Sequence, residues 1–254
     1  MESTVSAVPP ATTTSGPSPS VVQRAAAVFA RPARAWDNLE SHAQWWFPLL
    51  VMMIFAAASA ALLHQRALVP MIVEQWEQEV QNGRMSAEQM SRMQDFFTSP
   101  AGMAVTVGQQ LVAIPIVTLL AALLIWFGCG FVLGTKLRYR LALEVAAWAS
   151  LVNLPAFVIT SALAWSKETM RGIHVGFGIL LPETDSPSKL LIALGTILDG
   201  IGPLALWYVT VVILGAAALS GAQRKSVAWV LGGVYAAVLV FMAAMAAMFT
   251  PAAS

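Results

Sequence analysis

The sequence predicts an all-α fold, a polytopic transmembrane helical bundle of five spans. Of the 254 residues, 58% are hydrophobic and only 11% are charged, whereas an ordinary soluble domain has roughly 25% charged residues. The forty residues between Asp95 and Lys136 carry no charge, and ~20 apolar residues in a helix are enough to cross the hydrocarbon of a bilayer. Three basic residues follow within Lys136–Arg140, and a short basic loop of this kind indicates the cytoplasmic side.

Composition and motifs exclude several other functions. The net charge of +1 gives no sign of a nucleic-acid partner. The single cysteine, Cys129, allows neither a disulfide framework nor a cysteine metal site. No Gly-x-Ser-x-Gly, His-Glu-x-x-His or phosphate-binding loop is present, and the three histidines are scattered. We therefore predict no enzyme, no metal and no cofactor. The three histidines are His42, His64 and His174.

The N-terminal region divides into two parts. Residues 1–20 are rich in Ser, Thr and Pro and predict a disordered cytoplasmic tail. Residues 21–44 place basic residues between apolar residues at near-helical spacing, which is typical of an amphipathic segment in the membrane interface. In the alternative interpretation, residues 21–44 are a peptide that docks onto a partner protein. Tryptophan prefers the level of the lipid headgroups, so three residues are predicted interface anchors. They are Trp36, Trp45 and Trp46.

The predicted membrane domain covers residues 45–250. Its spans are expected at about residues 45–63, 104–127, 141–165, 203–219 and 227–249. Prolines fall inside or at the start of the second, third and fourth spans, and a proline inside a helix frees a backbone carbonyl that a neighbouring group has to satisfy. The predicted helix-break positions are Pro115, Pro155 and Pro203.

Two polar residues lie within the third predicted span. Glu144 follows Arg140 by four residues, so the two share a helix face, and an ion pair is favoured over a proton relay. Asn153 precedes Pro155 near the middle of the span, where its amide can satisfy the freed carbonyl. A polar point on a substrate path is the alternative for Asn153, because intramembrane polar groups are costly and often have a function.

The polar loop at residues 67–99 predicts an extracytoplasmic helical hairpin. Asn82-Gly83 ends the first helix, and Ser86 with Gln89 forms a capping-box pattern at the start of the second. Methionine and tryptophan line the apolar faces of both helices, so packing against the spans is the simple explanation and a ligand groove is the alternative. The second outer loop differs, since the alternating pattern of Ile173–Ile179 predicts an extended segment.

The thirty residues from Leu190 to Leu219 are too long for one simple crossing. Two glycines and Pro203 interrupt them directly after Asp199, which predicts an interfacial helix at 190–198 followed by the fourth span. In that arrangement the Asp199 carboxylate caps the positive end of the fourth helix. In the alternative, a continuous helix places Asp199 in hydrocarbon at a cost of ~2.5–3.5 kcal/mol, where it needs a partner.

The distribution of Lys and Arg predicts the orientation. The N-terminal region, the loop after the second span and the loop after the fourth span hold three, three and two of these residues. The two outer loops hold six across many more residues, and the C-terminal tail has none. The positive-inside rule therefore predicts a cytoplasmic N-terminus and an extracytoplasmic C-terminus in the cell membrane.

Several short motifs then resemble a known family. They are Phe29-Ala30-Arg31-Pro32, Trp36-Asp37-Asn38-Leu39, Trp46-Phe47-Pro48-Leu49-Leu50, Phe97-Thr98-Ser99-Pro100-Ala101-Gly102, Ala149-Ser150-Leu151 with Pro155, and Trp207. With them the chain resembles, over roughly residues 25–245, the bacterial branch of the Yip-type family, named for eukaryotic proteins that interact with Ypt/Rab small GTPases. The resemblance implies a five-span bundle with a cytoplasmic N-terminus in a bacterial inner membrane. Eukaryotic members act in vesicle budding and carry an Asp-Leu-Tyr-Gly-Pro-type motif, whose absence here argues against small GTPase binding.

Two functional hypotheses follow. The first is a non-catalytic protein that organises the membrane or scaffolds other components, with the bilayer, other membrane proteins or a second copy as partners. Its support is the interfacial segments and the lack of a reactive constellation. The second is a transporter or permease-associated subunit with a polar site near Asp199 and Asn153, because broken helices often line substrate sites.

Overall fold

The computed structural model describes residues 19–39, 43–182, 184 and 188–249. Within these residues the regular elements are all helices. Five helical runs are long and apolar enough to cross a membrane, which confirms the predicted all-α bundle of five spans. The runs are Trp46–Gln81, Pro100–Val132, Tyr139–Lys167, Pro203–Ser220 and Arg224–Phe249. The predicted disordered tail lies, except for its last two residues, outside the described part of the chain.

The helices follow one another along the chain with short connections. Their bounds are α1 (Val21–Ala30), η1 (Pro32–Arg34), α2 (Trp46–Leu63), η2 (His64–Leu68), α3 (Val69–Gln81), α4 (Ala87–Thr98), α5 (Pro100–Trp126), η3 (Phe127–Val132), α6 (Tyr139–Ser150), η4 (Leu151–Asn153), α7 (Leu154–Lys167), η5 (Phe177–Leu180), α8 (Lys189–Gly200), α9 (Pro203–Ser220) and α10 (Arg224–Phe249). Elements η2 and η3 are π-helical, whereas η1, η4 and η5 are 3₁₀ turns.

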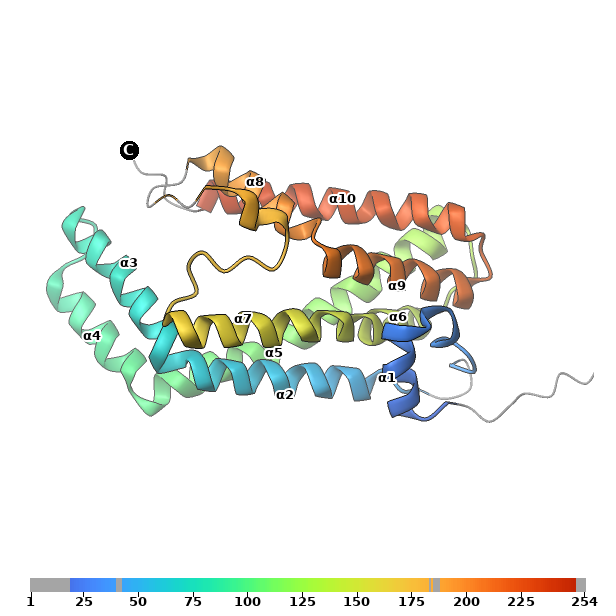
Figure 1. Cartoon of the computed structure of the whole chain (residues 1–254), viewed down its shortest axis with the longest axis horizontal. Coiled ribbons are helices and arrows are strands. Elements are labelled where there is room, and N and C mark those ends of the chain that lie inside the picture. The colour runs from blue at the N-terminus through green and yellow to red at the C-terminus, as the bar shows by residue number, and fades with distance from the viewer. Residues whose placement is uncertain (1–18, 40–42, 183, 185–187, 250–254) are drawn as a thin grey trace, which may run out of the picture.

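The bundle has two distinct ends (Figure 1). We call one the basic end, where the turn containing Lys136–Arg140 and the turn before Arg224–Lys225 lie together with α1. The opposite end carries the α3–α4 hairpin, and we call it the hairpin end. The last described residue, Phe249, also lies at the hairpin end. The chain therefore enters the bundle at one end and leaves it at the other, as an odd number of spans requires.

The first span is longer than predicted. The helix does not end at Leu63 but continues through the π-helical η2 into α3, so that one helical run reaches Gln81. The predicted hairpin is present, and Ser86 and Gln89 form the expected capping box at the start of α4. The hairpin is closed by side chains from both helices: the rings of Trp76 and Phe97 meet edge to face, with their centroids 5.4 Å apart.

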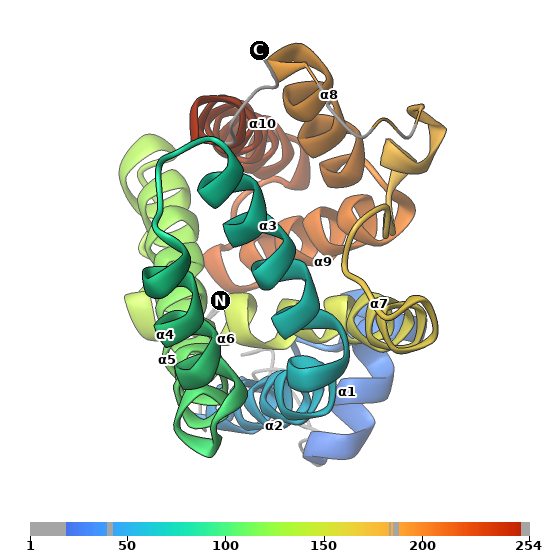
Figure 2. The ribbon, with the colours of Figure 1, turned by 90° about the vertical axis from the view of Figure 1, so that its left-hand side faces the viewer.

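The prolines of the second and third spans have different effects on the helices that contain them. Pro115 lies inside α5, which remains one helix across it. In the third span a 3₁₀ turn, η4, separates α6 from α7, and Pro155 falls in the first turn of α7, where the missing N–H costs little. In the end-on view α6 crosses the bundle obliquely, whereas α7 is seen down its axis (Figure 2). The predicted span at 141–165 is therefore a bent pair of helices.

The predicted break before the fourth span is confirmed. Helix α8 ends at Gly200, Gly202 is the extended N-cap of α9, and Pro203 opens α9. The preceding helix was expected over 190–198 and occupies Lys189–Gly200. It packs along α10 and against η5. Its predicted position in the membrane interface stays a prediction.

The core lies towards the basic end and centres on α6. Every residue from Leu141 to Ala149 is buried, and Trp148 is the largest of the fully buried side chains. Helices α2, α5 and α9 pack around α6. The outward faces of α5 and α10 remain apolar, for example at Leu120 and Phe241. Such exposed apolar faces are expected where the solvent is lipid, since lipid tails are as apolar as leucine.

Candidate functional site

Two groups of polar side chains lie among the apolar helices. The first, which we call the basic-end cluster, consists of Arg24, Gln44, Glu144 and Trp148. Arg24 extends from α1, Gln44 precedes α2, and the other two residues lie one turn apart on α6. The second, the break cluster, consists of His174, Asp199 and the backbone around the α8–α9 break. We describe the two in turn.

Arg24 is buried, with only 1% of its surface exposed. Its guanidinium donates to the backbone carbonyl of Ala35, to that of Asp37 at 3.0 Å and to the Gln44 side chain at 3.0 Å. Burial lowers the pKa of Arg24, while the carboxylates of Glu144 and Asp37 act in the opposite direction. An arginine stays protonated in proteins, so this buried cation needs all its partners.

Glu144 is the anion of the same cluster and is fully buried. Its carboxylate accepts from the Gln44 backbone N–H at 2.7 Å and from the Trp148 indole N–H at 3.2 Å. The predicted pair with Arg140 is present, with the charged atoms 3.9 Å apart. The Arg24 guanidinium lies 5.8 Å from the centre of the Trp148 ring. These contacts hold the N-terminal segment against α6, although residues 24 and 144 are far apart in sequence.

The three predicted anchors are placed differently from one another. Trp36 is 3% exposed and packs within the protein, where a Cβ on Gly215 of α9 would come within 2.6 Å of its ring. Trp36 therefore presents almost no surface to lipid, because Gly215 leaves space for its ring inside the bundle. Trp45 is partly buried against the core. Trp46 is 52% exposed and is the one whose side chain faces outwards.

The break cluster corrects the predicted role of Asp199. The residue belongs to the last turn of α8, and the N-cap of α9 is Gly202, with no side-chain hydrogen bond. The prediction of a carboxylate cap was therefore wrong, because α8 continues to Gly200 and the Asp199 carboxylate makes no hydrogen bond to the start of α9. Its carboxylate Oδ2 instead lies 2.8 Å from Nδ1 of His174. Its Oδ1 atom is buried without a hydrogen-bond partner among the described residues.

Three glycines allow the second outer loop to reach this break. A Cβ on Gly176 would lie 2.4 Å from the Asp199 backbone carbonyl, and one on Gly178 would lie 2.4 Å from Oδ1 of the same residue. A Cβ on Gly202 would lie 2.5 Å from the Cα of Gly176. After α7 the chain turns back along the bundle towards the start of α9 before it reaches η5 (Figure 1). The Tyr235 hydroxyl on α10 completes the contact by donating to the Gly200 carbonyl at 2.6 Å.

Asn153 does not belong to the break cluster. It ends η4, which packs against α1, α6, α7 and α9. Asp199 instead contacts His174 and the glycines of the outer loop. Among the described residues, no hydrogen bond or ion pair joins Asp199 to Asn153, the two residues of the predicted polar site.

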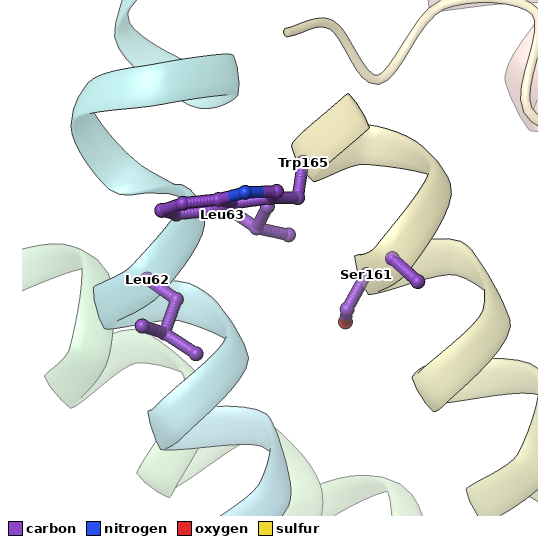
Figure 3. Close-up of a pocket in the computed structure, with 5 residues that line it drawn as sticks. Leu62, Leu63, Ser161 and Trp165 are labelled. Atoms are coloured by element: carbon purple, nitrogen blue, oxygen red, sulfur yellow. The ribbon is translucent and has the colours of Figure 1, made fainter. Parts of the chain in front are cut away.

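A small apolar hollow lies between α2 and α7 (Figure 3). Its volume is about 220 Å³. It is lined by Leu62, Leu63, Ser161, Ala162 and Trp165. The Ser161 hydroxyl donates to the Ser59 hydroxyl at 3.0 Å, so this hydroxyl already has a partner. At the hairpin end, the Trp165 ring extends from α7 towards α2 and closes the hollow.

Sequence reasoning missed two of the residues that make these clusters. His174 was read only as part of an extended segment, although the spacing of Gly176 and Gly178 after it is a signal of close backbone approach. Arg24 was predicted only as one of the basic residues of the amphipathic segment 21–44, and no signal in the sequence distinguishes it from the other arginines of that segment. Within the described residues, no group of three or more His, Cys, Asp or Glu side chains could hold a metal ion.

The five apolar spans and the buried α6 define a multi-pass helical membrane protein. The family model of the Yip1 domain matches residues 26–245, and the chain belongs to this family. It is a non-enzymatic membrane family. The resemblance found in the sequence is thereby confirmed, while the bacterial branch and the bacterial inner membrane stay predictions. No curated protein and no solved structure matches the chain.

Proposed function

We propose that this protein is a non-catalytic membrane-organising protein that acts through α1 at its basic end. One observation carries the proposal. Helix α1 lies across the direction of the spans at the basic end rather than along it (Figure 1), and Figure 2 places it at the edge of the bundle. An amphipathic helix in this position lies in the plane of the membrane interface and inserts its apolar side chains between lipids.

The side chains of α1 support this role. Val22 is 69% exposed and Phe29 is 41% exposed, although both are apolar. Arg24 and Val28, by contrast, are buried against the bundle. The helix is therefore held rigidly on one side and offers apolar groups on the other. A rigid support makes the insertion of Val22 and Phe29 more effective, because less conformational entropy is lost when they enter the lipid.

The proposal includes the orientation. Eight Lys and Arg residues lie in the N-terminal region and the two turns of the basic end, and such a bias favours the cytoplasmic side of a cell membrane. The N-terminus is then cytoplasmic and the C-terminus extracytoplasmic. Other membrane proteins or a second copy are the proposed partners, and crosslinking in intact membranes followed by mass spectrometry identifies them.

The test uses the full-length protein in vesicles of phosphatidylcholine and phosphatidylglycerol. We expect the wild-type protein to reduce the mean vesicle diameter in electron cryomicroscopy, and the double variant Val22→Ser/Phe29→Ser to lose most of this effect. The matched control is Ala26→Ser/Ala30→Ser, which changes two exposed residues of the same helix and little apolar surface. If the double variant keeps an unchanged melting temperature and still reshapes the vesicles, the proposal is wrong. A wild-type protein without any effect on diameter also contradicts it.

A transporter or permease-associated subunit is the second candidate, and the break cluster favours it. Discontinuous helices often form substrate and ion sites in transporters, and the α8–α9 break has His174 and Asp199 beside it. Proton flux into vesicles that contain a pH-sensitive dye tests this candidate. We expect Asp199→Asn to abolish a flux that the control Glu88→Gln, at the exposed hairpin, retains. Absence of flux in the wild-type protein ends this candidate.

A further inference from the structure

The hollow between α2 and α7 ends where the apolar part of each helix ends. On α2 the apolar run finishes with Leu62 and Leu63, after which His64-Gln65-Arg66 follows. On α7 the apolar run finishes with Trp165, after which Ser166-Lys167-Glu168 follows. The end of the hollow that Trp165 closes therefore lies at the level where hydrocarbon gives way to headgroups, and Trp is the residue that prefers this level.

An arginine lies at this end of the hollow. The Arg66 guanidinium lies over the Trp165 ring, 4.3 Å from its centre, and 2.9 Å from the Glu168 carboxylate. Lys167 follows two residues after Trp165 in the sequence and is exposed. An arginine has five N–H donors, and the pair with Glu168 leaves donors for a second acceptor. An apolar hollow with the Arg66 guanidinium beside its closing tryptophan fits a molecule with an apolar chain and an anionic head.

We propose that this groove binds an anionic phospholipid of the leaflet at the hairpin end. One acyl chain lies against Leu62, Leu63 and Ala162, and the phosphate accepts hydrogen bonds from Arg66. The hydroxyl group of the lining already has a partner, because Ser161 donates to Ser59. This inference requires only that the chain spans a membrane and does not rest on the membrane-organising role proposed for α1, which lies at the opposite end.

Selectivity comes from the head and from the shape of the hollow. Lipid tails outside are as apolar as the lining, so the transfer of an acyl chain from the bilayer into the groove has no hydrophobic driving force. Contact between the acyl chain and a preformed surface therefore fixes the position of the lipid, while Arg66 supplies the preference for a negatively charged head. The prediction is a site that holds phosphatidylglycerol longer than phosphatidylcholine.

The test uses the full-length protein in phosphatidylcholine vesicles that contain phosphatidylglycerol with a diazirine in one acyl chain. After illumination, mass spectrometry locates the labelled residues. We expect labelling to concentrate on the facing segments 59–66 and 158–165. Ala162→Trp fills the hollow and should reduce this labelling about fivefold, and Arg66→Gln should reduce the preference over diazirine-labelled phosphatidylcholine about fivefold.

The matched control is Leu163→Trp, which adds the same ring to the neighbouring exposed residue of α7 outside the hollow. It should leave labelling of the two segments unchanged. Labelling spread evenly over all five spans of the wild-type protein would mean a nonspecific lipid annulus and would overturn the proposal. Equal losses in Ala162→Trp and Leu163→Trp would also overturn it, and so would an unchanged lipid preference in Arg66→Gln. The wild-type distribution decides even where a variant fails to fold.

Discussion

The two ends of the bundle use charged residues in opposite ways. At the basic end, Arg24 and Glu144 are almost completely buried, and each makes several hydrogen bonds. Away from the basic end, the ion pairs are partly open, and the side chains of the His174–Asp199 pair at the α8–α9 break are 30% and 37% exposed. The pairs at the hairpin end join Arg66 to Glu168, Arg171 to Glu74, Arg84 to Glu79 and Arg92 to Glu88.

This difference in burial indicates that the charged residues of the basic end stabilise the fold, whereas the other charged residues remain accessible to ligands. A buried ion that loses its partner destabilises the fold strongly, whereas exposed ion pairs contribute little and are screened by salt. The basic end is therefore the part that fixes the N-terminal segment to the bundle. The hairpin end keeps cations that can exchange one acceptor for another, which the proposed lipid site requires. Three substitutions test this contrast, from the largest expected effect to the smallest.

Replacing Glu144 should have the largest effect. Glu144→Ala removes the anion next to Arg24 and leaves the Gln44 N–H and the Trp148 indole without their acceptor. We expect a loss of about 3 kcal/mol in the free energy of unfolding. The matched substitution at the other end is Glu74→Ala, which breaks the exposed pair with Arg171 and should cost less than ~1 kcal/mol. Denaturant titration in detergent micelles measures both, and similar losses would remove the contrast between the two ends.

An added methyl group at Gly176 should have an intermediate effect. Its Cβ would lie 2.4 Å from the backbone carbonyl of Asp199, which cannot move away as a flexible side chain could. We expect Gly176→Ala to destabilise by about 1–3 kcal/mol, as overpacking does elsewhere. The control is Gly108→Ala in α5, where no atom lies within 4 Å of the added Cβ, and a small gain in stability is expected. An unchanged melting temperature in Gly176→Ala would show that the loop and the break are not packed closely.

Neutralising Asp199 should have the smallest effect on stability. Asp199→Asn keeps the shape of the side chain but removes the charge that faces His174, and the pair is partly exposed. A loss of ~1 kcal/mol or less is expected, together with faster amide hydrogen exchange at residues 173–178. The control Arg92→Gln breaks an exposed pair on α4 and should leave exchange at 173–178 unchanged. If Asp199→Asn lowers the free energy of unfolding as much as Glu144→Ala does, the charges of the break cluster are structural and the contrast is wrong.

The candidate sites were predictable only in part. The Arg140–Glu144 pair followed from a spacing of four residues in a helix, and the structure contains it. The partner of Asp199 did not follow, because His174 lies 25 residues away and reaches it only through a loop that turns back along the bundle. Arg24 likewise meets its acceptors 11 to 20 residues further along, and its burial depends on the covering α6.

The amino-acid sequence by itself determined five apolar spans, the hairpin between the first two, the break before the fourth and the collection of basic residues at one end. Each of these follows from local properties, namely the length of apolar runs, capping residues, glycine and proline, and the cost of moving charge across lipid. Only the tertiary structure decided that Trp36 is buried against Gly215, that Asp199 faces His174 instead of capping α9, and that Arg24 lies beside Trp148. These contacts join residues distant in sequence, and the order in which helices pack is not encoded in the pattern of any one helix.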